Sequence, residues 1–163
     1  NRVLSEAWWW EVYVQYEFNE FLLLDRRLLS GTGPRLQLIK GKHGSSQIGT
    51  SAMVEEERLN VENIARTEAV QTIALRSSSY LTATLKGDDW KYVTTVYFQP
   101  RLDDLKDYRM VGEASFVYKL NKIFALTIDG RIRHDSRPPK TPTGSAEVLA
   151  TDMSIKNGLK LSW

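Results

Sequence analysis

Hydrophobic and polar residues alternate along most of the chain, most clearly toward its end. In residues 124–135 the apolar side chains fall on one face of an extended chain and the small, polar or charged ones on the other: Phe124, Leu126, Ile128 and Ile132 against Ala125, Thr127, Asp129, Arg131, Arg133 and Asp135. A two-residue period with one apolar and one charged face predicts a β-strand with one polar side. The same pattern returns after a proline-rich turn, in residues 153–163.

Similar alternation predicts further strands over residues 8–18, 21–29, 35–40, 47–57, 64–76, 80–86, 90–101 and 111–120. Gly31-Thr32-Gly33-Pro34 is expected to break the chain between two of them, and Gly87-Asp88-Asp89 to form a hairpin turn. A helix over residues 61–75 is an alternative, since Glu, Ala and Arg are helix formers, but Thr67, Val70 and Ile73 favour a strand. The pattern predicts about ten strands in one meander of hairpins.

Composition narrows the class of protein. The chain has 163 residues, which we interpret as one domain covering residues 1–163, with 22 Lys+Arg against 20 Asp+Glu and no cysteine. This balance gives no broad cationic field for nucleic acid, and the lack of cysteine excludes disulfides and thiolate metal sites. No apolar run approaches the roughly 18 residues of a membrane-spanning helix. The first residue is Asn and no signal peptide is recognisable, which leaves room for leading strands and a removed export signal before it.

Alternation alone does not distinguish a membrane barrel from a water-soluble one, but three features favour the membrane. Opposite charges lie in the middle of the polar faces and are expected to point into a narrow lumen: Glu11, Arg66, Glu68, Asp129, Arg131 and Arg133. The apolar faces end in Trp, Tyr and Phe, as interfacial anchoring predicts. The last residues resemble the terminal signal that outer-membrane barrels present to their assembly machinery, with Lys156, Gly158, Leu161 and Trp163 at the positions of the pattern. We therefore predict an all-β, antiparallel up-and-down transmembrane β-barrel of about 8–12 strands.

Several segments of the chain form a recognisable set of motifs: Arg26–Leu29 with Gly31–Pro34, Val96–Asp104, Asp107-Tyr108-Arg109, Gly112-Glu113-Ala114, His134–Pro139, Asp152 and Gly158-Leu159-Lys160. Together these segments resemble the salt-induced outer-membrane protein family, also catalogued as domain of unknown function 481. The motif positions that we single out are Gln99, Pro100, Asp107, Tyr108, Arg109, Asp135, Ser136, Pro138 and Pro139. The resemblance implies a Gram-negative outer-membrane β-barrel without an established activity. The chain departs from the family pattern in its Pro/Thr/Gly-rich insert after Pro139 and in ending on Trp where the family usually has Phe.

Catalytic and metal sites have weak support in the sequence. His134, Asp135 and Ser136 are the residue types of a hydrolase triad, but neighbouring residues of a strand point to opposite faces and cannot form a relay. We expect Asp135 and Ser136 to cap the strand end instead. The carboxylates of residues 103, 104 and 107 suit a hard cation, yet Arg101, Lys106 and Arg109 among them favour ion pairing. We expect no enzymatic activity, cofactor or metal.

The leading hypothesis is a small outer-membrane barrel with an envelope structural or stress role, or an anchor or subunit of a larger envelope assembly. Its expected partners are outer-membrane lipid and lipopolysaccharide, the barrel-assembly machinery during biogenesis and other envelope proteins, but no nucleic acid. The alternatives are a narrow channel, a lipid-modifying barrel enzyme and a soluble ligand-binding barrel. A barrel of eight to ten strands has a lumen that side chains nearly fill, which favours a closed or narrow barrel over an open porin.

Overall fold

The computed structural model describes residues 2–3, 7–19, 24–59, 71–138 and 149–161, and its regular structure there is β-strand. The strands are β1 (Arg2–Val3), β2 (Trp8–Asn19), β3 (Leu24–Lys40), β4 (Gly44–Leu59), β5 (Gln71–Lys86), β6 (Trp90–Pro100), β7 (Tyr108–Lys119), β8 (Phe124–Asp135) and β9 (Thr151–Leu161). No helix in this part of the chain has the length and apolar character needed to cross a bilayer.

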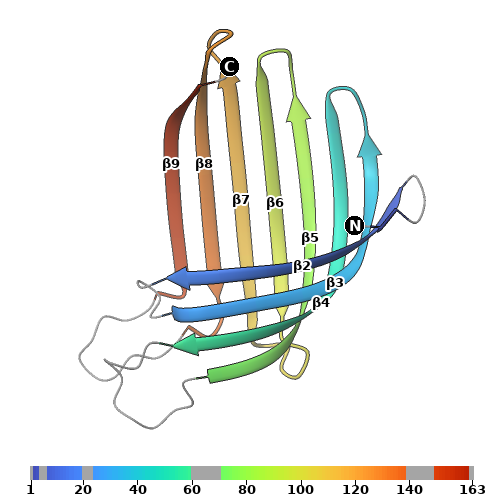
Figure 1. The fold of residues 1–163 in the computed structure, drawn as a ribbon, viewed down its shortest axis with the longest axis vertical. Coiled ribbons are helices and arrows are strands. Elements are labelled where there is room, and N and C mark those ends of the chain that lie inside the picture. The colour runs from blue at the N-terminus through green and yellow to red at the C-terminus, as the bar shows by residue number, and fades with distance from the viewer. Residues whose placement is uncertain (1, 4–6, 20–23, 60–70, 139–148, 162–163) are drawn as a thin grey trace.

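Each strand pairs with the next one along the chain, so the nine described strands form one antiparallel sheet in the order β1 to β9 (Figure 1). This confirms the all-β, up-and-down arrangement of hairpins that the alternation predicts. β1 and β9 are the two edges of the sheet, and no backbone pairing joins β9 to β1 or β2 among the described residues. The sheet is therefore open along a seam between β2 and β9.

One predicted break is wrong: Gly31-Thr32-Gly33-Pro34 does not separate two strands but lies inside β3. The predicted strands 64–76 and 80–86 are not separate either, because Ser77-Ser78-Ser79 lies inside β5, which continues to Lys86. Both segments stay extended because all of Gly31–Pro34 pairs with β2 and all of Ser77–Ser79 pairs with β4, so that tertiary pairing overrides local turn propensity. Most of the predicted strand 64–76 and of the alternative helix 61–75 lies outside the described residues, which resume at Gln71.

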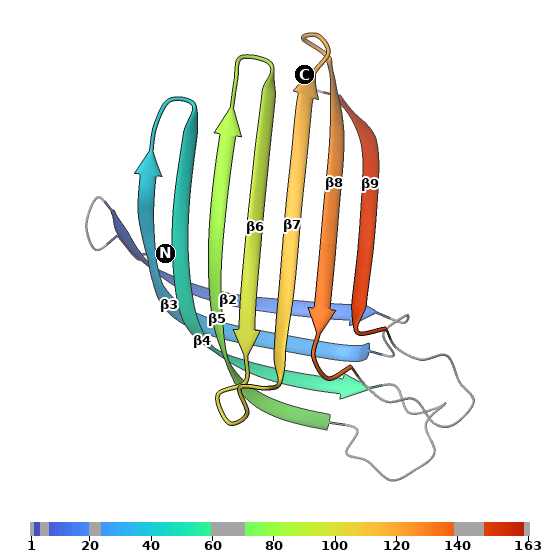
Figure 2. The ribbon, with the colours of Figure 1, turned by 180° about the vertical axis from the view of Figure 1, so that it is seen from behind.

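The sheet is strongly curled. β6 to β9 run almost straight and side by side, whereas β2, β3 and β4 cross them at one end before β3 and β4 turn upward (Figures 1 and 2). Gly33 permits the close approach of β3 and β4, because a Cβ on it would lie 2.0 Å from the Thr50 carbonyl oxygen. Glycine within a strand commonly marks such a bend or close backbone approach.

Apolar and polar side chains are distributed in the reverse of a water-soluble core. The buried hydrophobic residues of the described chain are Leu29, Met53, Ala74 and Ala125, whereas the buried polar or charged ones are Arg27, Glu55, Arg76, Ser78, Asp107, Arg109 and Asp135. Val12 and Val14 are 69% and 71% exposed, and the exposed large apolar residues within the other strands, such as Ile128 and Leu159, share this outer face. The concave face of the sheet is ionic and the convex face is apolar.

Candidate functional site

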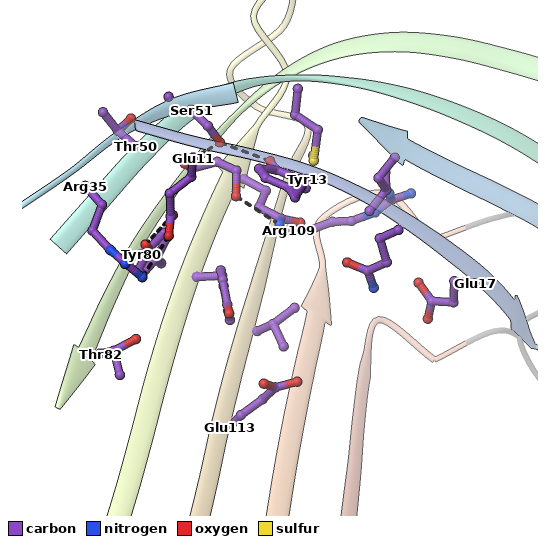
Figure 3. Close-up of a pocket in the computed structure, with 18 of the residues that line it drawn as sticks. Glu11, Tyr13, Glu17, Arg35, Thr50, Ser51, Tyr80, Thr82, Arg109 and Glu113 are labelled. Carbon is purple, nitrogen blue, oxygen red and sulfur yellow. Dashed lines mark hydrogen bonds and ion pairs between the residues drawn. The ribbon is translucent and has the colours of Figure 1, made fainter. Parts of the chain in front are cut away.

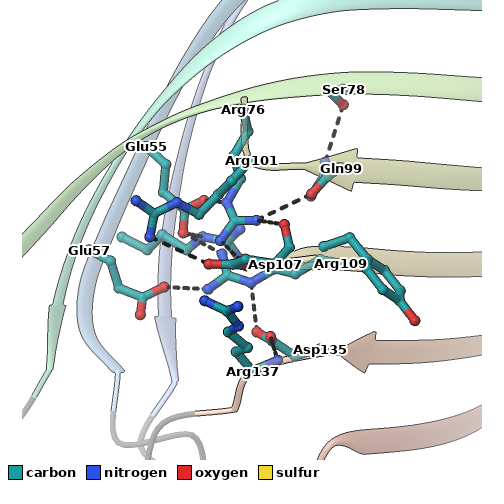
Figure 4. Close-up of polar contacts among 12 residues, drawn as sticks. Glu55, Glu57, Arg76, Ser78, Gln99, Arg101, Asp107, Arg109, Asp135 and Arg137 are labelled. Carbon is teal, nitrogen blue, oxygen red and sulfur yellow. Dashed lines mark hydrogen bonds and ion pairs between the residues drawn. The ribbon is translucent and has the colours of Figure 1, made fainter. Parts of the chain in front are cut away.

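The centre of the concave face is Glu55, on β4. Its carboxylate receives three guanidinium groups: Arg27 Nε at 3.1 Å, Arg76 Nε at 2.7 Å, and Arg109 Nη1 in a short contact (Figure 4). These arginines come from β3, β5 and β7, and β7 is three strands away from β4 in the sheet. Arg109 therefore reaches across the interior rather than along it. The Glu55 side chain is only 3% exposed.

Each of these arginines also has a second carboxylate partner. Arg109 contacts Glu57 at 2.9 Å and Asp135 at 2.7 Å, and Arg76 contacts Asp107 at 2.9 Å. Asp107 receives a further, longer contact of 3.4 Å from Arg101. The network thus ties β4, β5 and β7 to the loop after β6 and to the end of β8.

β2 joins the network through Glu17. Its carboxylate contacts Arg27 of β3 at 3.1 Å and Arg133 of β8 at 3.5 Å, which brings the end of β2 against the far side of the sheet. We call the whole set the ionic plug: Glu17, Arg27, Glu55, Glu57, Arg76, Arg101, Asp107, Arg109, Arg133 and Asp135. Five acids and five arginines balance in charge, so the interior carries no large net charge at this level.

A cavity of about 630 Å³ lies next to the ionic plug on the concave face. Tyr80 donates a hydrogen bond of 2.7 Å to Glu11, which is paired with Arg35 at 2.8 Å (Figure 3). Tyr13, two residues from Glu11 on the same face of β2, is hydrogen-bonded to Ser51 at 3.0 Å. Hydroxyl and amide groups make up much of the remaining lining, including Thr82, Gln47 and Gln99. The interior is therefore divided into a charged plug and a polar, partly open cavity.

Carboxylates of the concave face and of the loop after β6 are paired with guanidinium groups. Within the described residues, no group of three or more His, Asp or Glu side chains is arranged to hold a metal ion. In the loop after β6, Arg101 binds Asp103 at 2.6 Å, and this hydrogen bond holds the pKa of Asp103 below its ordinary value. Asp104 is paired with Arg137 at 2.8 Å. These carboxylates are therefore engaged by guanidinium groups.

A family model described as "Protein of unknown function, DUF481" matches residues 1–151. The chain belongs to the DUF481 family. No curated protein matches the chain, and no solved structure matches it.

In this DUF481 chain, the described motif positions gather at one end of the sheet, around the end of β6, the start of β7 and the end of β8, and they occupy both faces. Asp107, Arg109 and Asp135 are members of the ionic plug, and the Gln99 carbonyl accepts a hydrogen bond of 3.2 Å from Arg76. Ser136 accepts a hydrogen bond of 2.8 Å from the Tyr108 amide. Pro100 is paired with Tyr108 at the end of β6, Pro138 follows β8, and Pro139 lies outside the described residues.

The residues of the suspected triad point in different directions in the DUF481 chain. His134 contacts Thr151 at 2.9 Å and Tyr108 on the outer face, whereas Asp135 faces inward to Arg109. Ser136 donates to the Lys106 carbonyl at 2.9 Å. No relay connects the three side chains.

The predicted lumen charges have several different partners. Glu11 pairs with Arg35, Arg133 with Glu17, and Arg131 with Glu113 at 3.6 Å. Asp129 faces the same side and lies opposite Lys156 of β9. Arg66 and Glu68 lie outside the described residues, as does Trp163, while Lys156, Gly158 and Leu161 of the terminal pattern are part of β9.

Sequence reasoning missed Glu55 and Arg27 as central residues of this DUF481 chain. Alternation places Glu55 and Glu57 on the polar face of their strand, but Glu56 between them makes the run look like a charged surface segment. The available signal was the spacing of two residues, which puts Glu55 and Glu57 on one face with Met53. Which arginines they meet depends on the curl of the sheet.

Proposed function

We propose that this DUF481 protein is a small β-barrel of the Gram-negative outer membrane with a structural or stress-related role in the envelope. The observation that carries the proposal is the inverted distribution of side chains: apolar residues are exposed on the convex face while charged residues are buried on the concave one. Water-soluble domains bury their apolar residues, whereas membrane barrels turn them to lipid and keep polar groups inside. The resemblance to the salt-induced outer-membrane family supports the same assignment.

Strand lengths and connections fit a bilayer. β6 to β9 have 11 or 12 residues each, close to the roughly 9–11 residues of a tilted transmembrane strand. One end of the sheet has the short turns 41–43, 87–89 and 120–123. The other has the short connection 20–23 and the three longest connections, 60–70, 101–107 and 136–150. Outer-membrane barrels have short periplasmic turns and longer extracellular loops. We therefore assign the short-turn end to the periplasm.

Closure of the seam between β2 and β9 would complete the barrel. Counting from β2, the eighth strand is β9, so these two edges run antiparallel and satisfy the geometry of a closed up-and-down barrel. The end of β2 already contacts β8 through Glu17 and Arg133. Unpaired strand edges are strongly unfavourable in hydrocarbon, which supplies the driving force for closure on insertion.

A closed, non-conducting barrel suits an anchor or structural role better than the role of a channel through which solutes diffuse. The ionic plug fills one end of the interior, and its central side chains are almost inaccessible to solvent. Ion pairs sheltered from solvent are screened much less by salt than surface pairs. A barrel held by such pairs would keep its stability when the external ionic strength rises, which agrees with a role in salt stress.

A narrow channel is the second candidate, favoured by the cavity of about 630 Å³ beside the plug. The two functions differ in planar bilayers, where a channel gives discrete conductance steps and a plugged barrel gives none. Steps that vanish when the lumen is narrowed at Tyr13 or Tyr80 would support the channel instead of the structural role.

The decisive experiment is membrane fractionation of the expressed protein, combined with gel mobility of unboiled and boiled samples. We expect outer-membrane location and a mobility shift on boiling, because folded barrels resist detergent denaturation. Recovery of the folded protein in the soluble fraction without detergent would refute the proposal.

Seam closure has its own test, because the chain contains no cysteine. Val14→Cys is combined in turn with Asn157→Cys and Leu159→Cys, all on the outer face near the middle of the two edges. We expect one of the two pairs to form a disulfide in the membrane-inserted protein. Val14→Cys with Thr94→Cys, on a strand remote from the seam, is the negative control. Failure of both seam pairs would contradict direct closure.

A further inference from the structure

Five lysines surround the concave face at the short-turn end of the sheet. Lys86 and Lys91 are directly paired across β5 and β6, and Lys119 and Lys160 are both paired with Ala125 of β8. Lys40 is paired with Ser45, which is paired in turn with Thr84 on the inner face of β5. Because paired residues of an antiparallel sheet point to the same side, all five belong to the face that carries the cavity. We call this set the lysine mouth.

No ion pair with a described residue neutralises the lysines of the mouth. All five lysines are exposed, and none forms an ion pair with a described carboxylate. Like charges paired directly across two strands, as at Lys86 and Lys91, destabilise a sheet. The nearest acids along the chain, Asp88 and Asp89, lie in the turn between them and are also exposed.

The inner face of β9 shows how the chain balances a lysine elsewhere. Lys156, four residues farther from the mouth than Lys160, lies opposite Asp129 of β8, whereas Lys160 lies opposite Ala125. A lysine deeper in the interior thus has an acidic cross-strand neighbour, and the one at the mouth does not. The positive potential is concentrated at the entrance.

We propose that the lysine mouth recruits small anions, carrying phosphate or carboxylate groups, into the cavity beside the ionic plug. This inference rests on the proposed function, since it treats the concave face as the lumen of an inserted barrel. Rings of lysine or arginine select anions at pore entrances, and low-dielectric walls focus their field. The plug closes the other end, so the anion binds in a blind vestibule that opens on the periplasmic side.

The cavity contains groups that suit an anionic ligand once it has entered. Arg131 and Glu113 are only loosely paired at 3.6 Å, with side chains 47% and 48% exposed, so the guanidinium can turn to an incoming oxyanion. Tyr97 and Thr82 add hydroxyl donors to the same lining. A guanidinium group binds phosphate and carboxylate with similar two-point geometry. The site is therefore expected to accept either kind of oxyanion.

The test uses a single cysteine inside the lumen as a reporter. Ser115→Cys places a thiol on the inner face of β7, between Lys119 at the mouth and Glu113 in the cavity. Its rate of modification is measured with methanethiosulfonate reagents that carry a sulfonate, a trimethylammonium or a neutral group. We expect the sulfonate reagent to react roughly tenfold faster than the cationic one, because clustered charge raises the local counter-ion concentration.

Neutralising the mouth should remove this preference. Lys86→Gln, Lys91→Gln and Lys119→Gln together are expected to reduce the sulfonate rate roughly tenfold while leaving the neutral reagent unchanged. Lys106→Gln, an exposed lysine in the loop at the other end, is the matched control and should change neither rate. Equal modification rates for the sulfonate and cationic reagents in the Ser115→Cys protein that keeps all five lysines would overturn the proposal.

Protection experiments identify the ligand group. Inorganic phosphate and acetate are each added during labelling: stronger protection by phosphate assigns a phosphate ligand, stronger protection by acetate a carboxylate one, and protection by neither overturns the binding site. Insertion is scored separately by heat-modifiable gel mobility in zwitterionic vesicles. Failure to insert contradicts the proposed function, whereas an inserted protein without charge preference contradicts only this inference.

Discussion

Glu55→Gln is expected to destabilise the folded protein strongly. The Glu55 carboxylate is 3% exposed and is shared by Arg27, Arg76 and Arg109. Glutamine has nearly the same shape but lacks the negative charge, and its amide group presents N–H donors to guanidinium donors. Removing one partner of a buried ion pair costs about 3–5 kcal/mol because a buried charge is left uncompensated. The remaining contacts of Arg109 with Glu57 and Asp135 favour the lower part of this range.

Glu113→Gln is the matched control, with the same chemical change on the same face of the sheet. Glu113 and Arg131 are 3.6 Å apart and about half exposed, and such pairs contribute about 0–1 kcal/mol. Both variants are unfolded in urea after insertion into vesicles, and the folded fraction is read from gel mobility and tryptophan fluorescence. Midpoints that agree between the two variants would refute the idea that the plug holds the fold together.

A second substitution separates lost charge balance from lost packing. In Glu55→Gln/Arg76→Gln the excess positive charge is removed, and Asp107 keeps its contact with Arg101 at 3.4 Å. We expect the double variant to be more stable than the sum of the single effects predicts, because residues of one ionic network are coupled. Additive effects would indicate that Glu55 acts through packing alone.

Two further substitutions test the close strand approach and the membrane-facing surface. Gly33→Ala should prevent most of the protein from folding, since its Cβ would lie 2.0 Å from the Thr50 carbonyl oxygen, whereas Gly130→Ala has nothing within 4 Å and should fold normally; the heat-shifted fraction of each variant measures this. Ile128→Arg on the outer face should destabilise the inserted barrel by about 2–4 kcal/mol, the cost of a lipid-facing arginine near the bilayer midplane, while Thr127→Arg on the inner face should cost less. Equal urea midpoints for the two arginine variants would argue against a lipid-facing surface.

The fold was predictable to the extent that it depends on local pattern. Alternation in residues 8–18, 90–101 and 124–135 assigned the strands and their two faces, because a period of two residues is a property of the extended chain itself. The same logic failed at Gly31–Pro34 and Ser77–Ser79. Those residues have turn propensity, and pairing with the neighbouring strands β2 and β4 keeps them extended.

The alternation of polar and apolar residues could not predict which charged side chains of the ionic plug pair with one another. The two-residue alternation places Arg109 and Glu55 on the polar faces of their strands. It does not predict their contact, which joins β7 to β4 across the interior. It exists only because the sheet curls far enough to bring its two halves together. That curl depends on close approaches such as the one at Gly33, whose effect is visible only when the neighbouring strand is in place.

The ionic plug and the lysine mouth have opposite effects on the seam between β2 and β9. Pairing charges across the interior favours a tightly curled sheet, and the contact between Glu17 and Arg133 already draws β2 toward β8 at one end. At the other end the uncompensated lysines of the mouth repel one another and favour separation. For the proposed closed barrel we therefore expect closure to begin at the long-loop end, and the short-turn end to close last, when the unpaired edges of β2 and β9 enter lipid.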